Sequence, residues 1–241
     1  MEVEKYQEMA RIQDQHWWFR GRRYLFACVL RNLQLDRDIS ILEIGCGTGA
    51  NLSFLQHFGA VSAVEMDEFS RNYAREKSGI DVQYGKLPDS LPFPDKKFDL
   101  ICMFDVLEHI EHDSQALMAV KSRLKADGLI LLTVPATKWL FGRHDEMFHH
   151  FRRYSRRELK ERILQSGLKL SAISYFNTFL FPAALFARML DFISFSGNST
   201  GMNVPRKSIN DALYRIFISE QPMLKKSLLP FGLSLLAVAS Q

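Results

Sequence analysis

Residues 41–51 read ILEIGCGTGAN and carry an apolar run into a glycine-rich turn. The run from Ile39 to Ile44 is typical of a buried strand, and Gly45, Gly47 and Gly49 follow it directly. Glycines at this place permit a tight turn and let a ligand approach the backbone N–H groups at the start of the next helix. The stretch therefore predicts a ligand-binding loop at the carboxyl end of the first strand of a sheet.

The residues after this loop alternate between strand and helix patterns. We predict a helix over 50–58, a strand over 61–66 and a polar helix that ends near Ser78. Further strands are predicted over 81–84, 98–104 and 129–134, with a helix over 113–125 before the last of them. Strands that alternate with helices form parallel sheets with helical crossovers. The predicted fold is α/β, with a doubly wound, mostly parallel sheet.

Both ends of the chain depart from this alternation. Apolar residues at helical spacing lead into HWWFRGRR at 16–23, so residues 1–38 are predicted to form an N-terminal helical arm. After the fifth strand, HDEMFHHFRRY at 144–154 is predicted to be a loop. Ser155 and Glu158 form a capping box for a helix that ends at Gly167, and a strand follows over 168–175.

The C-terminal part is predicted to hold an insertion. Two apolar helical segments with a turn-rich break between them occupy 176–226, and a last strand covers 233–239. We therefore predict a core of residues 39–175 and 227–241, with a helical lobe, 176–226, inserted before the last strand to cover an acceptor site.

Composition restricts the class of protein. Among 241 residues, 47% are hydrophobic and 24% charged, as in ordinary globular proteins. The net charge of +4 is mild, and basic residues cluster at 20–23 and 152–157 without forming one stripe, so we expect no nucleic-acid partner. Cys28, Cys46 and Cys102 lack CxxC spacing, which favours reduced thiols in a cytoplasm.

The hydropathy pattern predicts no membrane-spanning helix. The first residues, MEVEKYQEM, lack the pattern of a secretory signal. The longest uncharged run, 172–187, is shorter than the roughly 20 residues that span a bilayer. We expect a cytoplasmic protein, with peripheral contact to the inner face of a membrane as an open alternative.

Two carboxylates discriminate between ligands for the glycine loop. Gly45, Gly47 and Ala50 also fit the dinucleotide fingerprint GxGxxA, with Glu65 twenty residues after the first glycine. Glu43 would repel a pyrophosphate in a partly desolvated turn, whereas it would hold an ammonium group. S-adenosylmethionine carries such an ammonium beside its sulfonium, and Glu65 could accept hydrogen bonds from both ribose hydroxyls. S-adenosylmethionine is the favoured ligand, and a dinucleotide-dependent oxidoreductase remains the alternative.

Four motifs in order give this chain a family resemblance: ILEIGCGTG, AVEMD, LPFPDKKFDLICMFDVLEHI and LKADGLILLTVP. Residues 39–136 resemble the class I S-adenosylmethionine-dependent methyltransferases, which implies a Rossmann-like core. The resemblance implies that Glu65 binds ribose, Met66 flanks adenine and Leu87 reaches the adenine edge. It also implies that the cofactor's methionine moiety and the floor of the site are formed by Gly45, Cys46, Gly47, Thr48, Gly49, Phe104, Asp105 and Val106. The chain lacks the acid that many members place soon after the glycine at Gly85, so the resemblance does not explain how adenine is recognised.

The stretch HWWFRGRR has two interpretations. Its aromatic residues could pack on the core while its arginines are solvated, which is the usual outcome for such a helix. Amino-terminal arms of the family often lie over the cofactor, so Arg20 or Arg23 could instead pair with the methionine carboxylate while Trp18 forms a lid.

The stretch HDEMFHHFRRY follows the fifth strand, so it emerges at the edge of the sheet where ligand crevices of open α/β sheets lie. As a metal site it offers His144, Asp145, His149 and His150, but without zinc-type spacing, and methyl transfer from a sulfonium needs no metal. We predict no metal here. A solvated charged turn remains open, and acceptor binding with catalysis is favoured.

Specific roles follow for a hydroxyl acceptor, which must lose its proton. His144 or His150 is the predicted base with Asp145 to orient it, and His109 is a second candidate. Arg152 and Arg153 suit a phosphate or carboxylate on the acceptor, and Tyr154 could donate a hydrogen bond or only pack.

HWWFxxRR, HDxxxxHxRRY and the later YFN and LFP together resemble a bacterial methyltransferase subgroup, whose genes often lie near those for glycosyltransferases and polyprenol-linked sugar assembly. That resemblance implies a small-molecule or lipid-linked acceptor. The phenylalanines within 176–195 could form the core of the lobe or an apolar face for a lipid-like acceptor or a membrane. A protein that binds S-adenosylmethionine without catalysis also remains open, and the sequence does not indicate an oligomeric state.

Overall fold

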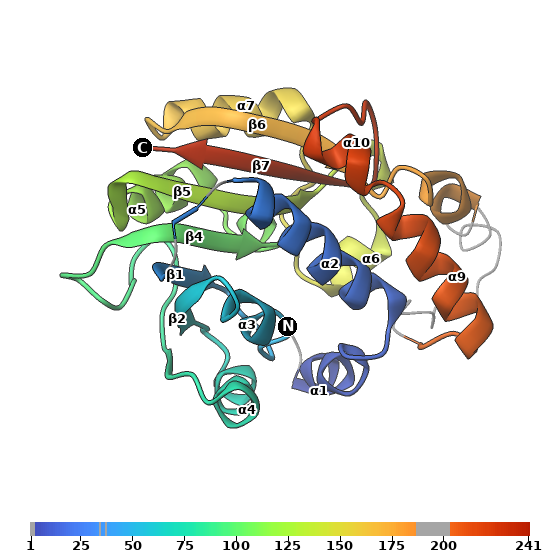
Figure 1. The fold of residues 1–241 in the computed structure, drawn as a ribbon, viewed down its shortest axis with the longest axis horizontal. Helices are drawn as coiled ribbons and strands as arrows, with labels where there is room; N and C mark the ends of the chain where they lie inside the picture. The colour runs from blue at the N-terminus through green and yellow to red at the C-terminus, as the bar shows by residue number, and fades with distance from the viewer. Residues whose placement is uncertain (1–2, 34, 37, 187–202) are drawn as a thin grey trace.

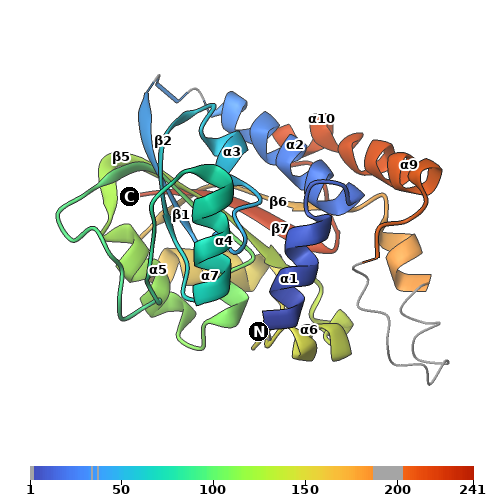
Figure 2. The ribbon, with the colours of Figure 1, turned by 90° about the horizontal axis from the view of Figure 1, so that it is seen from below.

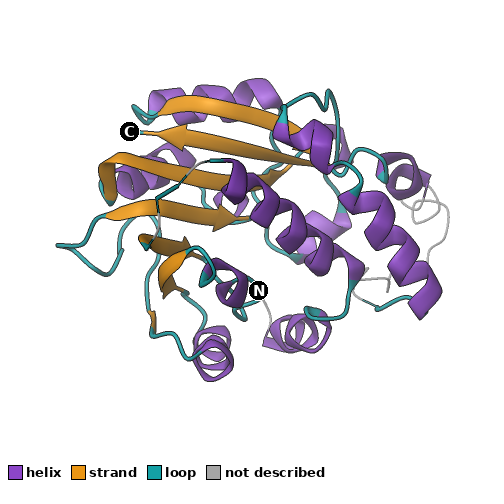
Figure 3. Ribbon diagram, in the orientation of Figure 1, coloured by secondary structure: helices purple, strands orange, loops and turns teal. Residues whose placement is uncertain are grey.

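The computed structural model describes residues 3–33, 35–36, 38–186 and 203–241 (Figure 1). One seven-stranded sheet forms the centre, in the order β3-β2-β1-β4-β5-β7-β6 (Figure 3). Its strands are β1 (Ile39–Ile44), β2 (Gly59–Val64), β3 (Val82–Gln83), β4 (Phe98–Phe104), β5 (Leu124–Pro135), β6 (Lys169–Phe176) and β7 (Ser234–Ser240). The five strands from β3 to β5 pair in parallel, and β7 runs antiparallel to both β5 and β6. The predicted doubly wound, mostly parallel α/β sheet is confirmed.

Helices cover both faces of this sheet, as the view from below shows (Figure 2). One face is covered by α2 (Trp17–Asn32), α3 (Leu52–Leu55), α9 (Lys207–Ile218) and α10 (Gln221–Lys225). The opposite face is covered by α5 (Asp113–Lys121) and α7 (Arg156–Gln165). Strands β1, β4 and β7 between the two layers are almost wholly buried, which explains their mostly apolar sequences.

The remaining helices lie near the edges. Helix α4 (Glu68–Ser78) packs beside β3, with Asp67 as its cap and Gly79 in the left-handed conformation at its end. Helix α1 (Val3–Ile12) lies against α4 and reaches α6 (Arg143–Met147) through a bond from the Lys5 Nζ to the carbonyl of Met147. Two short 3-10 turns follow β4 and β5: η1 (Leu107–His109) and η2 (Lys138–Leu140).

Helix α2 is an integral layer of the domain. Leu25, Phe26 and Leu30 are buried on the sheet, and the ring of Phe26 stacks on that of Phe104 with centroids 4.4 Å apart. On its outer side Trp18 stacks on Phe217 of α9 at 5.1 Å. A Cβ at Gly21 would lie 2.4 Å from Phe217, so glycine is required for this close approach. The aromatic residues of HWWFRGRR therefore pack internally.

Several predicted boundaries were wrong. The predicted helix over 50–58 is α3, only Leu52–Leu55, and the strand predicted at 81–84 is the two-residue β3. Strand β5 begins at Leu124 because Leu124 pairs with Phe98, with a register shift before the next pair, Leu100 with Leu129. The predicted loop over 144–154 begins as helix α6, since the carboxylate of Asp145 accepts the backbone N–H of Gly142 at 3.1 Å and caps the turn. The capping box of Ser155 and Glu158 is confirmed.

Part of the predicted helical insertion is described. A helix over 181–186 follows β6, and α9 and α10 precede β7. Among the phenylalanines of 176–195, Phe176 is buried, whereas Phe179 and Phe186 are exposed. Phe192 and Phe195 lie outside the described residues. None of the helices in the described part of the chain is both long and apolar enough to cross a membrane.

Candidate active site

The glycine loop wraps around the end of β1. The backbone N–H of Gly45 donates to the carbonyl of Val64 at 2.8 Å, and Gly45, Gly47 and Gly49 all have positive φ. A Cβ at Gly45 would lie 2.6 Å from Val106, just beyond β4, whereas a Cβ at Gly47 would meet nothing within 4 Å. The loop thus packs tightly against the residue after β4 at Gly45, whereas the space beside Gly47 is empty of atoms from the described residues. The backbone at Gly47 is therefore accessible to a ligand.

Glu43 is buried below this loop with one free oxygen. Its Oε1 accepts a hydrogen bond from Asn51 at 2.8 Å, and its Oε2 has no partner among the described residues. Burial raises the pKa of Glu43 to about 8. A ligand ammonium would supply both the missing donor and the compensating charge, so this observation fits S-adenosylmethionine.

Glu65 is held rigidly at the end of β2. Its two oxygens accept the backbone N–H groups of Gly47 at 2.8 Å and Asp67 at 2.9 Å. Burial raises its pKa, although these hydrogen bonds oppose the shift. The carboxylate keeps further lone pairs for ribose hydroxyls. The neighbouring Met66 is 57% exposed, as a residue that flanks a ligand base would be before the ligand binds.

The amino-terminal arm contacts this loop through residues that sequence reasoning missed. Thr48 Oγ1 donates to Gln13 Oε1 at 2.7 Å, and both side chains are buried. Tyr6 lies close enough to Glu65 and Asp67 for their charges to add to the burial that raises its pKa. Tyr6 is one of the residues at helical spacing before HWWFRGRR, and this spacing predicts a helix. Spacing alone does not indicate that Tyr6 lies near the acids of the loop.

The arginines of HWWFRGRR in α2 each have a partner within the protein. Arg22, which was not singled out, pairs with Asp105 at 2.5 Å and donates to Thr133 at 3.1 Å. Arg23 donates to the carbonyl of Gln13 at 2.9 Å, and Arg20 pairs with Asp211 at 3.4 Å. Cofactor contact by Arg23 and Trp18 remains a prediction.

Phe104 ends β4, and Asp105 and Val106 follow it; their predicted place in the floor of the cofactor site remains a prediction. Phe104 is buried against Phe26, and Asp105 takes a left-handed φ of 56° while Arg22 and Thr133 hold its carboxylate. Cys46 and Leu87 are buried, and Leu87 belongs to the core cluster on the other face of the sheet. Of these residues, Val106 lies beside the loop, because its side chain is 2.6 Å from the place of a Cβ at Gly45.

His150 and Asp145 form the pair that the sequence predicts. His150 Nδ1 lies 2.9 Å from Asp145 Oδ1, and Arg153 Nε donates to the same oxygen at 2.8 Å. Burial works against the charge of Asp145, but the bonds from His150 and Arg153 outweigh it and hold its pKa at about 2. Asp145 therefore stays ionised and orients His150, and Arg153 is committed to Asp145 and to the carbonyl of Ala136.

His109 joins this pair, and so does Glu108, which sequence reasoning missed. The rings of His109 and His150 meet edge to face with centroids 4.7 Å apart. Burial, helped by His150, lowers the pKa of His109 to about 4, and burial raises the pKa of Glu108. His144 on α6, the other predicted base, packs at a tilt against Phe148, with ring centroids 4.7 Å apart. The signal for Glu108 was its place beside His109 in LEHI.

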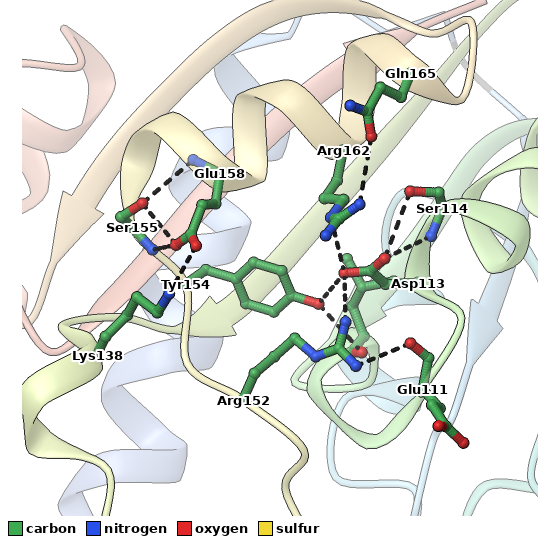
Figure 4. Close-up of polar contacts among 11 residues, drawn as sticks. Glu111, Asp113, Ser114, Lys138, Arg152, Tyr154, Ser155, Glu158, Arg162 and Gln165 are labelled. Carbon is green, nitrogen blue, oxygen red and sulfur yellow. Dashed lines mark hydrogen bonds and ion pairs between the residues drawn. The ribbon is translucent and has the colours of Figure 1, made fainter.

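Arg152 and Tyr154 are bound to Asp113 at the start of α5 (Figure 4). Tyr154 is buried and donates from its hydroxyl at 2.9 Å, while Arg152 and Arg162 lie 3.1 and 3.4 Å from the carboxylate. These contacts give Arg152 and Tyr154 a structural role in joining α5 to α7. Their predicted contact with an acceptor remains a prediction.

Comparisons with known proteins agree with this geometry. The methyltransferase domain family matches residues 15–173. A ubiquinone biosynthesis O-methyltransferase of Rickettsia felis is 26% identical over 57% of this chain and 62% of its own length. An uncharacterized methyltransferase of Staphylococcus carnosus is 35% identical over 43% of this chain and 51% of its own length. The chain thus spans about half the length of the curated relatives it matches.

Solved structures share the fold. An S-adenosylmethionine-dependent methyltransferase of Mesorhizobium loti superposes with a TM-score of 0.58 at 15% identity, covering 95% of this chain and 100% of that one. A second, from Aquifex aeolicus, gives 0.55 at 20% identity over 73% of this chain and 93% of that one. The matched domain, the glycine loop and the two buried carboxylates lead to one conclusion: the chain belongs to the methyltransferase domain family, whose cofactor is S-adenosylmethionine.

Proposed function

We propose that this protein transfers a methyl group from S-adenosylmethionine to a hydroxyl of a small-molecule or lipid-linked acceptor. The observation that carries the proposal is the His150–Asp145 pair, which lies in one cluster with His109 and Glu108 next to the end of β4. A relative matched over 57% of this chain is named a ubiquinone biosynthesis O-methyltransferase, which supports an oxygen acceptor.

Residues around the loop would hold the cofactor. Glu43 binds its ammonium, Glu65 its ribose hydroxyls, and the backbone at Gly47 lies alongside. When bound, S-adenosylmethionine supplies an electrophilic methyl group, and the electron pair of the broken carbon–sulfur bond stays on sulfur. Catalysis by the protein then consists mainly of aligning the acceptor and excluding water.

His150 removes the acceptor proton as the new oxygen–carbon bond forms. Because Asp145 occupies Nδ1, Nε2 is the nitrogen that receives this proton. The ionised Asp145 stabilises the resulting imidazolium, and Arg153 keeps Asp145 in place.

The proposal of a lipid-linked acceptor is supported by a separate feature, a group of exposed aromatic side chains. Trp139, which follows β5, is 66% exposed, and Phe231, just before β7, is 50% exposed. The ring of Phe181 contacts both of these rings. This aromatic surface lies at the sheet edge from which residues 144–154 emerge, and it suits the apolar tail of a lipid-like acceptor. Retention of the protein on vesicles of anionic lipid tests this part, and loss of retention in Trp139→Ala is expected.

Two experiments test the proposal in sequence. Calorimetric titration with S-adenosylhomocysteine should show binding, while NADH as the control ligand should show none. Transfer of labelled methyl from S-adenosylmethionine is then measured over phenols, sugars and lipid-linked hydroxyls. Methylation of a nitrogen or carbon acceptor alone, or binding of NADH alone, would overturn the proposal.

A further inference from the structure

One buried cluster contains more potential metal ligands than a mechanism with a single histidine base requires. Glu108, His109 and His150 each offer one ligand atom, and these three atoms all lie within 4.8 Å of one another. Glu108 and His109 come from η1 after β4, whereas His150 comes from the segment after α6. The fold thus brings together two imidazoles and one carboxylate from separate parts of the chain.

The carboxylate of Glu108 lacks a partner. It is 0% exposed, and neither of its oxygens has a hydrogen-bond partner among the described residues. The other two acids nearby have cations of their own, since Asp105 pairs with Arg22 and Asp145 with Arg153. Within the residues that the structure describes, Glu108 is therefore the one of these three acids without an ion pair. A buried carboxylate in that position is costly unless it takes up a proton or binds a cation.

His150 is oriented as a metal-ligating histidine usually is. Its Nδ1 lies 2.9 Å from the carboxylate of Asp145. Histidines that ligate metals almost always donate their other ring N–H to a carboxylate or a carbonyl. The ring of His150 thus has Nδ1 fixed and Nε2 left for a ligand, and the ring of His109 lies beside it with centroids 4.7 Å apart.

From this geometry we propose that Glu108, His109 and His150 bind a divalent transition metal ion, with Zn²⁺ as the best-suited ion. Two imidazoles and one carboxylate are a common donor set for Zn²⁺ and for Fe²⁺. Bonds of about 2.0–2.2 Å place tetrahedral ligand atoms about 3.3 Å apart, so the ligand atoms would close by no more than about 1.5 Å on binding. Rotation of these side chains about their χ angles can provide that movement.

The catalytic meaning of this site rests on the proposed function. An ion here would bind the acceptor oxygen and favour its ionised form, and His150 would then serve as a ligand instead of a base. Metal binding is nevertheless independent of turnover. A failed acceptor screen would leave the metal site standing, and failure to bind metal would leave a histidine-based transfer standing.

The test is metal binding by the full-length chain after chelation and dialysis. Calorimetry with Zn²⁺ should give one ion per chain, and Co²⁺ should produce the visible absorption of a nitrogen- and oxygen-ligated ion. Glu108→Gln and His150→Ala should each bind at least about 10-fold more weakly, and Asp145→Asn about 10- to 100-fold more weakly through its effect on His150. His57→Ala, at an exposed histidine whose Nδ1 lies 2.8 Å from the carbonyl of Ser53, is the matched control and should bind as the parent does.

Two results would overturn the proposal. The first is no saturable binding of Zn²⁺ or Co²⁺ by the parent, which would mean that Glu108 is simply protonated. The second is unchanged metal binding by folded Glu108→Gln and His150→Ala. Circular dichroism establishes that each variant is folded. If Glu108→Gln does not fold, His150→Ala and His109→Ala decide the outcome.

Discussion

The glycine-loop region and the His109–His150 region lie on the same sheet edge but depend on sequence in opposite ways. The loop region is built from short local stretches, because Glu43 lies at the end of β1, the glycines follow it directly, and Glu65 comes directly after the neighbouring β2. The histidine region joins residues about 40 positions apart, from η1 and from the segment after α6. The first can be recognised as a motif, whereas the second exists only in the folded chain.

The largest effect is expected in the histidine region. His150→Ala should lower kcat by about 10²- to 10⁴-fold once an acceptor is known, because the residue that takes the proton is gone. Affinity for S-adenosylhomocysteine should not change. His57→Ala is the control for a general effect of losing a histidine. Equal turnover in His150→Ala and the parent would remove His150 from the mechanism.

The next effect belongs to the loop region. Glu43→Gln should weaken binding of S-adenosylhomocysteine by about 10- to 100-fold, since a charged hydrogen bond to the ligand ammonium is replaced by a neutral one. Calorimetry measures this change. Glu146→Gln, which replaces a carboxylate on α6 after β5, is the control and should bind normally. If both variants bind alike, Glu43 does not hold the ammonium.

The same buried acid makes stability depend on pH. The folded-state pKa of Glu43, about 8, lies above the ordinary value of 4.5, so the folded protein holds this proton more tightly than the unfolded chain does. Its contribution to stability is present below about pH 4.5 and is lost as the pH rises to about 8. From pH 5 to pH 8, Glu43→Gln should therefore gain about 1 kcal/mol or more relative to the parent, in urea unfolding without cofactor. A constant difference between the two proteins would contradict this.

The smallest expected effect is on stability and concerns the hydrogen bond from Tyr154 to Asp113. Tyr154→Phe should lower the free energy of unfolding by about 1 kcal/mol, because a buried hydroxyl bond to Asp113 is lost while Arg152 and Arg162 remain. Tyr84→Phe, at a tyrosine that is 54% exposed, should be nearly neutral. Cofactor affinity should be the same in both variants. A larger loss of acceptor affinity than of stability would instead support a direct contact between Tyr154 and the acceptor.

The order and type of the core helices and strands could be predicted from local sequence patterns, but the residues at which they begin and end could not. The parallel order of strands followed from alternating apolar runs, and the cap of α7 followed from Ser155 and Glu158. The length of β5 and the start of α6 depended on pairing with Phe98 and on the bond from Gly142 to Asp145. Such contacts form only when other segments are in place.

By itself the sequence determined the α/β class, the glycine loop from Gly45 to Gly49 and the positions of Glu43 and Glu65 beside it, because these residues lie at or directly after the ends of two neighbouring strands. The pairing of His150 with Asp145 was predicted because the two residues are only five positions apart. The tertiary structure alone decided that Arg22 holds Asp105, that Gln13 reaches Thr48 and that the buried carboxylate of Glu108 has no hydrogen-bond partner in the described part of the chain. These contacts depend on which side chains the packed helices bring to the end of β4. Burial by distant segments, more than residue type, sets the protonation state and the partners of each group.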